Sequence, residues 1–404
     1  MKVLHVFYST LPSSKGSDIR SRDVIESQAG IGIDVLAVSS PFQDPVEMGA
    51  KVERIAGCPC YRSSDVDSRL RISEKDQGLM VKLRKMTKLL SFGDFVGTLA
   101  AREGPDVIHA HSTFFCAFAG RRAAQRLGKP LVYEVRSLWE ERAVMKSPTL
   151  KTRVVARLIR LIETHAMRMA DHVVVISEGL YRDVVARGIP QHCITLVRNG
   201  INLSRVCGGS ATINGKRAAD WVFAYIGNLS DIEGLDILIE AVKILRERGW
   251  NNALQIYGDG PAMDRLKLQA RNVEGVTFFG RFNPEDAREI YAEVDVVVNP
   301  RRRSSLTDKV TPLKTLEAMA WRKPIVVSSV AGMLELVRDG ETGFVFEADD
   351  VLALVGTLIR ILENPEVLPP VIERAWEFVS EERSWYANAK AYWELYEQLV
   401  KNRI

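Results

Sequence analysis

The segment TPLKTLEAMA (311–320) has the most informative pattern for binding a charged ligand. Pro312 suits the first turn of a helix, where its missing N–H costs no hydrogen bond. The unpaired N–H groups of such a turn, together with the positive end of the helix dipole, favour an anion such as a nucleotide diphosphate. Glu317 follows one to two turns later, among apolar residues that mark a packed helix. The segment therefore predicts an anion site with a carboxylate nearby, and a Glu317 that is solvated on an exposed face is the alternative.

Basic residues gather just before this helix. The run NPRRRSSLTDK (299–309) carries three arginines and Lys309, and Lys314 falls within the first turn of the helix. Arginine binds phosphate oxygens with two parallel hydrogen bonds, and lysine binds them as a point charge. We therefore expect Arg301, Arg303, Lys309 or Lys314 to hold the anion. A solvated loop with scattered bases is the alternative.

Two histidines alternate in DVIHAHS (106–112), a predicted strand. His109 and His111 are two residues apart, so their side chains point to the same face of the sheet. His109 is expected in the core or behind the site. A metal ion bound by the pair is conceivable, but the sequence shows no third ligand.

Two further segments carry candidate contacts. YEVRSLWEE (133–141) ends a predicted strand with Arg136 and Glu140, which are candidates for contacting a substrate; alternatively the two pair with each other, four residues apart. The loop SSKGSDIR (13–20) contains Gly16, where a backbone without a Cβ could approach a phosphate closely. The chain has no G-x-G-x-x-G motif, which argues against a nicotinamide or flavin enzyme.

The elements that must position these residues are short apolar runs alternating with helical patterns. Strands are expected at 2–8, 34–40, 106–112, 130–136, 172–178 and 193–199, and again at 221–227, 253–258, 276–280, 294–300, 324–329 and 343–347. Near-continuous apolar strands separated by helices predict parallel sheets covered on both faces. The fold class is therefore α/β, with two Rossmann-like, doubly wound domains whose strands end at a common cleft.

The length of 404 residues also favours two domains. We predict an N-terminal domain over 1–203, a linker rich in Gly, Ser and Ala over 204–220, and a C-terminal domain over 221–372. The helical segment 373–404 carries six tryptophan and tyrosine residues and is expected to pack back toward the N-terminal domain.

The composition, with 46 % hydrophobic and 26 % charged residues, excludes disordered and fibrous classes. The five cysteines form no paired framework, which suggests a reducing compartment and no structural zinc. The first residues are too few and too polar for a signal peptide, and no apolar run is long enough to span a membrane.

The net charge of +4 conceals an asymmetry between the halves of the chain. Residues 1–200 contain 30 basic and 21 acidic side chains, net +9, whereas residues 201–404 contain 25 and 30, net −5. Segment 80–90 places Lys82, Arg84, Lys85 and Lys88 among apolar residues. This pattern is typical of helices that lie on anionic membranes, and it equally fits an ordinary core-facing helix with a solvated basic side. Segment 151–168 has a similar pattern, but there an ordinary helix with an apolar side on the core and a solvated basic side is favoured.

Seven pieces, in order and spacing, resemble the retaining glycosyltransferases of family 4 with the GT-B fold, over essentially the whole chain. They are SKGSDIRS, DVIHAHS, ADHVVVISEGL, VRNGIN, YIGNLSDIEGLDILIEA, IYGDGP and TPLKTLEAMAWRKPIVVS. The stretches YEVRSLWEE and VTPLKTLEAMA are most similar to enzymes of bacterial exopolysaccharide and exosortase-associated systems.

The resemblance implies roles for individual residues. Glu317 would accept hydrogen bonds from the donor ribose, and His111 would lie beside the donor sugar as a hydrogen-bond donor or a positioning group. Gly258 and Arg281 would frame the base. The resemblance adds Gly227, Asn228 and Thr311 to the donor pocket, beside Gly16, Arg301, Arg303 and Lys314, which the local residue pattern suggests. Family members face the acceptor from the neighbourhood of YEVRSLWEE, so Arg136 and Glu140 are the candidate acceptor contacts.

The chain departs from the family pattern at two places. The usual first glutamate, eight positions before Glu317, is Lys309 here, so Lys309 acts at the reacting sugar or Asp308 takes that role. The usual Arg and Lys that hold the diphosphate are Asn228 and Glu233. A carboxylate about 4 Å from a phosphate charge costs roughly 4 kcal/mol at an effective dielectric of 20. Glu233 must therefore point away, pair with a base, or lie in a site without a diphosphate.

The resemblance implies a retaining glycosyltransferase that moves a sugar from a nucleotide diphosphate sugar to a polysaccharide or lipid-linked acceptor. It implies no cofactor or metal, no nucleic-acid partner, and a cytoplasmic location. The positive charge of the N-terminal half and of segment 80–90 adds the expectation of a peripheral contact with an anionic membrane. The alternatives are a nucleotide-sugar 2-epimerase of the same fold and a non-catalytic nucleotide-sugar-binding protein.

Overall fold

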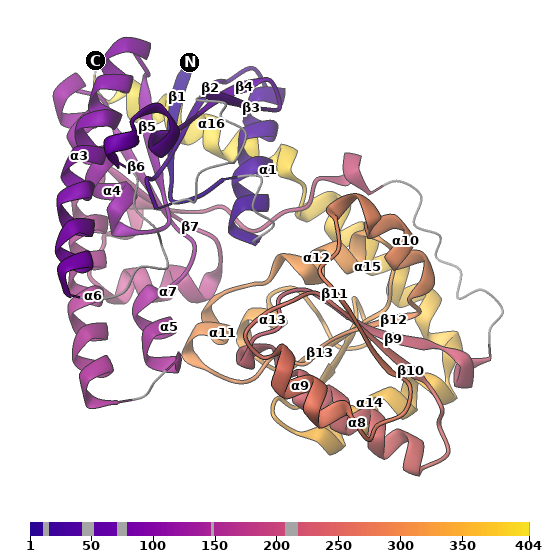
Figure 1. Cartoon of the computed structure of the whole chain (residues 1–404). Helices are drawn as coiled ribbons and strands as arrows, with labels where there is room; N and C mark the ends of the chain where they lie inside the picture. The colour runs from indigo at the N-terminus through magenta and orange to yellow at the C-terminus, as the bar shows by residue number, and fades with distance from the viewer. Residues whose placement is uncertain (11–15, 43–51, 71–78, 147–148, 207–216, 404) are drawn as a thin grey trace. The chain divides into compact units, whose positions relative to one another are not determined.

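A computed structural model describes residues 1–10, 16–42, 52–70, 79–146, 149–206 and 217–403 of the chain (Figure 1). The chain divides into two compact units. Unit 1 comprises Met1–Arg198 and Trp385–Ile404, and unit 2 comprises Asn199–Ser384. Each unit is built on one parallel or mostly parallel sheet with helices on both faces, so the predicted α/β class is confirmed.

The sheet of unit 1 has the strand order β3-β4-β2-β1-β5-β6-β7-β8. The strands are β1 (Lys2–Phe7), β2 (Asp34–Ser39), β3 (Val52–Ile55), β4 (Cys58–Arg62), β5 (Val107–His111), β6 (Leu131–Val135), β7 (His172–Val175) and β8 (Ile194–Leu196). All six predicted strands are present. The antiparallel pair β3–β4 was not predicted, because both strands are short and polar; Pro59 is tolerated there in a strand close to the sheet edge.

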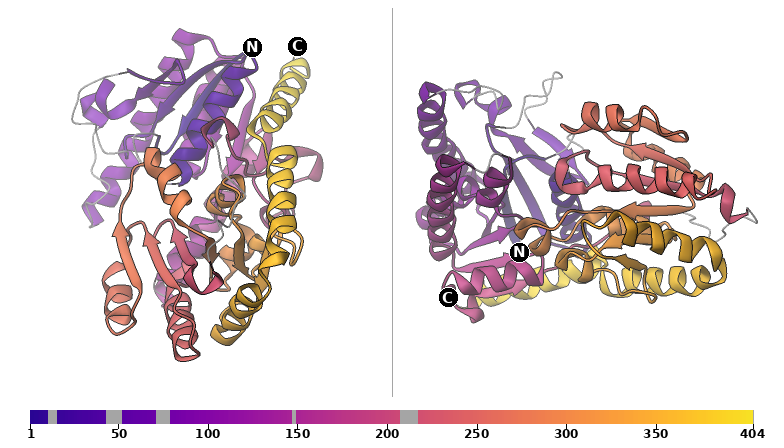
Figure 2. Two further views of the ribbon diagram at one scale, coloured as in Figure 1. Left: turned by 90° about the vertical axis from the view of Figure 1, so that its right-hand side faces the viewer. Right: turned by 90° about the horizontal axis from the view of Figure 1, so that it is seen from below.

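Eight α-helices surround this sheet in the described part of unit 1. They are α1 (Gly16–Gly30), α2 (Ser63–Val66), α3 (Leu79–Glu103), α4 (Phe114–Leu127), α5 (Trp139–Lys146), α6 (Leu150–Met169), α7 (Glu178–Ala186) and α16 (Trp385–Lys401). In Figure 2, α16 is the yellow helix at the C-terminus, and it packs against α1. The predicted segment 373–404 is therefore split, since its residues up to Ser384 belong to unit 2.

Strand periodicity decides which side chains α1 and α16 cover. Val3 and Phe7 of β1, Val107 of β5 and Val132 of β6 share one core with α16. Side chains two apart on a strand point to the same face. The polar side chains of His5 on β1, His109 and His111 on β5, and Glu134 on β6 therefore face α1 and α16 as well. This face carries the unit 1 site described below.

The sheet of unit 2 is entirely parallel, with the order β11-β10-β9-β12-β13-β14. Its strands, all predicted, are β9 (Val222–Ile226), β10 (Ala253–Tyr257), β11 (Val276–Gly280), β12 (Val296–Asn299), β13 (Ile325–Ser328) and β14 (Phe344–Phe346). One core packs it against α8 (Leu235–Glu247), α9 (Met263–Ala270) and α14 (Val351–Glu363). The other packs it against α10 (Ala287–Glu293), α12 (Leu313–Ala320), α13 (Ala331–Leu334) and α15 (Leu368–Glu382), and α11 (Ser305–Lys309) precedes α12.

Part of the predicted linker, 207–216, lies outside the described residues. Its flanks form two single 3-10 turns, Leu203–Arg205 and Ala218–Asp220, which fits a segment without helical or strand periodicity. No helix in the described ranges is long and apolar enough to cross a bilayer.

The two basic segments have different outcomes. In segment 80–90, the side chains of 80–86, including Lys82, Arg84 and Lys85, lie outside what the structure describes. For 151–168, the favoured interpretation of an apolar side on the core is wrong, because Leu158 and Leu161 of α6 are exposed. Small residues, Ala156 and Ala166, face the core instead, together with Glu163 and Met167.

Candidate functional site

Each sheet has one point where the strand order reverses. In unit 1, β1 lies between β2 and β5; in unit 2, β9 lies between β10 and β12. Ligands of open parallel sheets bind at the carboxyl ends of the strands beside such a point. The candidate residues cluster there in both units.

The unit 2 cluster joins Glu233 to two of the predicted bases. The Lys314 ammonium donates hydrogen bonds to the carboxylate of Glu233 and, at 2.6 Å, to the hydroxyl of Tyr225. Arg301 Nε lies 3.4 Å from the same carboxylate, and its Nη1 donates to the Val310 carbonyl at 3.0 Å. Of the three possibilities for Glu233, pairing with a base is therefore confirmed. The cluster holds two cations and one anion, so it keeps a positive charge.

Burial sets the protonation of this cluster. Burial lowers the pKa of Lys314 to about 8, although the Glu233 charge acts in the opposite direction. Burial raises the pKa of Glu233, but the charges of Lys314 and Arg301 outweigh it, so the net shift is downward. Near neutral pH the carboxylate is ionised and Lys314 is close to its titration range.

Glycines at the strand ends let the backbone come close to this cluster. Gly258 has φ 129°, and a Cβ there would lie 1.8 Å from the Gly227 carbonyl oxygen. A Cβ on Gly227 would meet the Lys314 side chain at 3.3 Å. Asn228 is exposed, and its carbonyl accepts a hydrogen bond from Tyr225 at 2.8 Å. The ends of β9 and β10 are thus lined by backbone rather than by side chains.

The start of α12 adjoins the cluster. Pro312 is the residue before the helix, not in its first turn as predicted, and no side chain caps the helix there. Asn199, from the VRNGIN segment, donates to both the carbonyl and the hydroxyl of Thr311, at 2.8 and 3.0 Å. This role of Asn199 was missed, because 112 residues separate the partners. Glu317 lies half-buried in the following turn.

The other predicted residues of unit 2 have different surroundings. Arg303 pairs with Glu347 at 2.8 Å, so it does not join Arg301 on Glu233. Arg281 is mostly exposed and pairs with Asp259 at 3.0 Å. Lys309 ends α11, and the adjacent Asp308 accepts a hydrogen bond from the Ala331 N–H. This bond ties Asp308 to α13, which disfavours it as the substitute for the missing glutamate.

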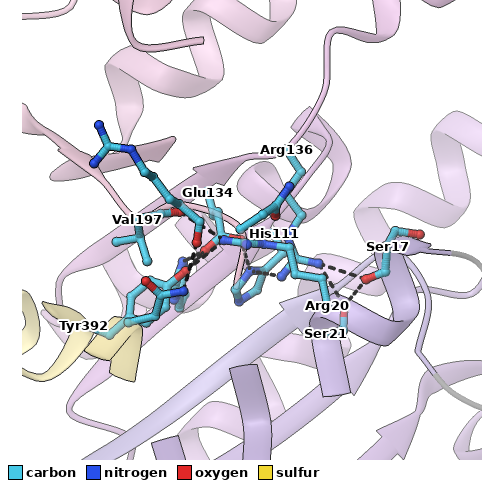
Figure 3. A network of polar contacts seen from close by, with 12 residues as sticks. Ser17, Arg20, Ser21, His111, Glu134, Arg136, Val197 and Tyr392 are labelled. Carbon is cyan, nitrogen blue, oxygen red and sulfur yellow. Dashed lines mark hydrogen bonds and ion pairs between the residues drawn. The ribbon is translucent and has the colours of Figure 1, made fainter. Parts of the chain in front are cut away.

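The unit 1 site is organised by a buried carboxylate, Glu134 of β6 (Figure 3). Arg20 Nε and Arg136 Nε donate to Glu134 Oε1 at 3.1 and 2.7 Å, and the Tyr392 hydroxyl donates to Oε2. Burial raises the pKa of Glu134, but the two guanidinium groups outweigh it and hold the pKa well below the usual range. Glu134 was not predicted as a site residue, because it lies within an otherwise apolar strand.

Histidines extend this network. His111 Nδ1 accepts from Arg136 at 2.7 Å, and its Nε2 lies 2.8 Å from His5 Nδ1. His5 Nε2 in turn lies 3.0 Å from Gln28 Oε1, and the Tyr396 hydroxyl lies 2.6 Å from His109 Nδ1. Because the Arg136 guanidinium can only donate, His111 is protonated on Nε2 and donates to His5. The tautomer of His111 is thereby fixed.

Burial lowers the pKa of all three histidines, that of His5 to about 4, so they are neutral at physiological pH. Both ring nitrogens of His111 have partners inside unit 1 and the residue is 1 % exposed, which favours the positioning role over direct donation to a sugar.

A third histidine, His5, belongs to this group and was not predicted from the sequence. The ring nitrogens of His5, His109 and His111 lie within 4.8 Å of one another, a grouping that could hold a metal ion. However, the His5 and His111 nitrogens are engaged in hydrogen bonds, and Arg136 places a positive charge beside them. The described residues therefore fit a neutral hydrogen-bonded network better than a cation.

The predicted pairing of Arg136 with Glu140 is wrong. Arg136 also donates to the Ser17 carbonyl at 3.2 Å and to the Ser21 hydroxyl at 2.9 Å, so its guanidinium is largely used within unit 1. Glu140 instead accepts from Arg187 at 2.5 Å. Gly16 is the first residue of α1, and a Cβ there would meet no atom within 4 Å; most of the loop before it, 11–15, lies outside the described residues.

A second buried carboxylate, Glu163 of α6, lies on the opposite face of the sheet. It accepts from the Tyr133 hydroxyl at 2.6 Å and from the Phe114 N–H at 3.2 Å. Burial raises the pKa of Glu163 to about 7.

Glu163 should make stability depend on pH. In the native state the Glu163 carboxyl keeps its proton to a higher pH than in the unfolded chain. The free energy of unfolding should therefore fall as pH rises from about 4.5 to about 7. Glu163→Gln cannot ionise and should be more stable than wild type at pH 8 by roughly 3 kcal/mol. Urea unfolding of both proteins at pH 4.5 and 8 measures the difference, and an equal pH slope for the two proteins would contradict the assignment.

Comparison with known proteins gives a consistent result for both halves of the chain. Residues 15–200 match a glycosyl transferase 4-like domain, and residues 220–364 match the glycosyl transferases group 1 domain. The chain is 27 % identical to an alpha-D-kanosaminyltransferase from Streptomyces kanamyceticus over 66 % of this chain and 71 % of that protein. It is 25 % identical to an uncharacterized glycosyltransferase from Methanocaldococcus jannaschii over 58 % of this chain, but only 60 % of that relative's length is spanned.

Solved structures share the fold across the whole chain. A sucrose-phosphate synthase from Thermosynechococcus elongatus has a TM-score of 0.77 at 21 % identity, with all of both chains covered. HepE from Anabaena, in complex with UDP and glucose, has a TM-score of 0.71 at 17 % identity, covering 98 % of this chain and 99 % of that one. The fold is thus that of the two-domain GT-B class.

The two matched domains follow each other along the chain and together span most of it. The chain is a glycosyltransferase with an N-terminal glycosyl transferase 4-like domain and a C-terminal group 1 domain.

Proposed function

We propose that this glycosyltransferase transfers a hexosyl residue from a nucleotide diphosphate sugar, with retention of configuration, to a polysaccharide or lipid-linked acceptor in exopolysaccharide biosynthesis. The single observation that carries the donor assignment is the Lys314–Glu233–Arg301 cluster at the reversal point of the unit 2 sheet. It keeps a positive charge beside the uncapped start of α12, which suits a diphosphate. The ligands of two proteins with the same fold support a nucleotide sugar as donor: Anabaena HepE was solved with UDP-glucose. TarM from S. aureus was solved with UDP and alpha-GlcNAc-glycerol among its ligands.

Each unit has its own task in the proposed reaction. In unit 2, Lys314 and Arg301 neutralise the departing diphosphate, and Glu317 accepts hydrogen bonds from the ribose. In unit 1, His111 is a positioning residue whose tautomer Arg136 fixes. Electrostatic stabilisation of the leaving group and orientation of the reactants are usually the largest contributions to such a reaction. No cofactor or metal is part of the proposal, because cationic side chains and helix N–H groups serve the leaving group.

Incubation with a panel of nucleotide sugars and candidate acceptors tests the reaction. The proposal requires release of nucleotide diphosphate that depends on the acceptor, and an anomeric configuration in the product equal to that of the donor. Formation of an epimer without acceptor would instead support the 2-epimerase alternative. Binding without turnover of any donor would support a non-catalytic binder.

Glu317→Gln should weaken nucleoside diphosphate binding about tenfold, because an acceptor of ribose hydrogen bonds becomes partly a donor. The matched control is Glu274→Gln, since Glu274 is 92 % exposed in the same unit. Calorimetry with UDP and ADP measures the affinity. An unchanged affinity in Glu317→Gln, with both nucleotides, would remove Glu317 from the donor pocket.

The location is also part of the proposal. We place the enzyme in the cytoplasm, in peripheral contact with the anionic inner face of the membrane, where a lipid-linked acceptor would be available. The supporting observation is the net charge of +9 over residues 1–200. The side chains of 80–86 lie outside what the structure describes, so the contact surface has to be identified from other residues.

A further inference from the structure

The surface of α6 combines features that an ordinary surface helix does not have. A capping box at Thr149 fixes its start, and Ala156, Glu163, Ala166 and Met167 hold one side of it against unit 1. Of the two sides of α6 that do not pack on the core, one is apolar and the other is basic.

The apolar side is uncovered. Six large apolar side chains of α6 are exposed, by 39 to 80 %: Leu150, Val154, Val155, Leu158, Leu161 and Ile162. At about 100° per residue they cover an arc of about 140°. Each of the eight other exposed large hydrophobic residues in the described ranges lies on a different element. The concentration on α6 is therefore a patch and not the scattered exposure that any protein surface shows.

The basic side flanks this patch. This side of the helix carries Arg153, Arg157 and Arg160, and Lys151 and Arg168 lie near the two ends of the helix. Its one acid, Glu163, is buried on the inner side. Arg160 lies 3.5 Å from Asp183, and Arg168 donates to the Arg187 carbonyl. Lys151, Arg153 and Arg157 are exposed, so an uncompensated positive charge lies beside exposed leucines.

We propose that α6 lies flat on the surface of an anionic lipid bilayer, with its leucines in the acyl boundary and Arg153 and Arg157 on the phosphates. An amphipathic helix with a basic flank has the chemistry for this position. A second copy of the chain fits less well, because a twofold contact through the same helix face would bring these arginines together. The inference assigns the membrane contact of the proposed function to one helix, and it depends on that proposal only for the lipid-linked acceptor.

The experiment is co-sedimentation of the full-length protein with vesicles of phosphatidylglycerol and phosphatidylcholine, or of phosphatidylcholine alone, at low and high salt. One variant carries Leu158→Gln and Leu161→Gln, and another carries Arg153→Gln and Arg157→Gln. All four side chains are exposed, so both variants should fold. The matched control carries Leu268→Gln and Leu352→Gln, which removes leucines 71 and 62 % exposed in unit 2.

Wild type and the control should bind the anionic vesicles and bind neutral vesicles weakly. Each α6 variant should bind at least tenfold less, and salt should weaken binding of the wild type. Equal binding by all variants, or no binding of wild type at low salt, would overturn the proposal. So would a wild-type dimer that Leu158→Gln and Leu161→Gln convert to a monomer. Calorimetric affinity for UDP or ADP should be equal in all variants, and this readout separates failure of the membrane contact from failure of the proposed donor site.

Discussion

Glu134→Gln is expected to lower the free energy of unfolding by about 3–5 kcal/mol. Glutamine has the size of glutamate but no charge, so Arg20 and Arg136 would remain cationic and buried without their shared anion. Removing one partner of a buried ion pair costs more than the pair contributes, because the remaining charge stays desolvated. Urea unfolding near pH 7 measures the change.

The control for this prediction is Glu178→Gln. Glu178 pairs with Arg198, but both side chains are about 40 % exposed, so its loss should cost less than about 1 kcal/mol. The pH profile gives a second check. Because the native pKa of Glu134 is lowered, its contribution is present above the unfolded pKa and is lost as pH falls below it. Equal stability of Glu134→Gln and wild type at pH 7 would mean that the two arginines find other partners.

The strands of both sheets could be predicted because buried parallel strands are near-continuous apolar runs, as in HVVV (172–175) and VVVN (296–299). The edge strand β3 and its neighbour β4 could not, because they lack such a run. The histidine pair was recognisable from its spacing on one strand. The outcome for α6 shows a further limit: a helical period predicts an apolar side, but only the fold decides which side meets the core.

The polar partners were harder to predict because they are distant in sequence. Tyr392 reaches Glu134 across 258 residues, and Lys314 reaches Glu233 across 81. Glu233 was recognisable because a carboxylate beside a phosphate is unfavourable, and pairing with a base was one of three ways to relieve that charge. The sequence had no comparable signal for Glu134 or His5, since a buried polar residue inside a strand resembles an ordinary interruption of the apolar pattern.

Binding of nucleoside diphosphate should fall as pH rises through about 8, because Lys314 then loses the proton that makes it a cation. Lys314→Met should lower the affinity at pH 7 by roughly 10- to 150-fold, the range for a hydrogen bond to a charged group of about 1.5–3 kcal/mol. Lys243→Met is the matched control, since Lys243 pairs with Glu240 on the exposed side of α8. Calorimetry with UDP and ADP from pH 6.5 to 9.5 gives both quantities.

Glu233→Gln tests how the Lys314–Glu233 ion pair changes the pH dependence of diphosphate binding, compared with Lys314 alone. The Glu233 charge raises the pKa of Lys314, so without it the fall in affinity should begin at a lower pH than in wild type. Glu233→Gln should also be less stable in the absence of ligand, because the largely desolvated cations Lys314 and Arg301 then repel each other without their shared carboxylate. Added diphosphate should restore part of that stability by binding the native state. A wild-type affinity that is flat across pH 8, or the same midpoint in Glu233→Gln, would show that Lys314 does not bind the diphosphate, and Arg301 would then be the remaining base of the cluster.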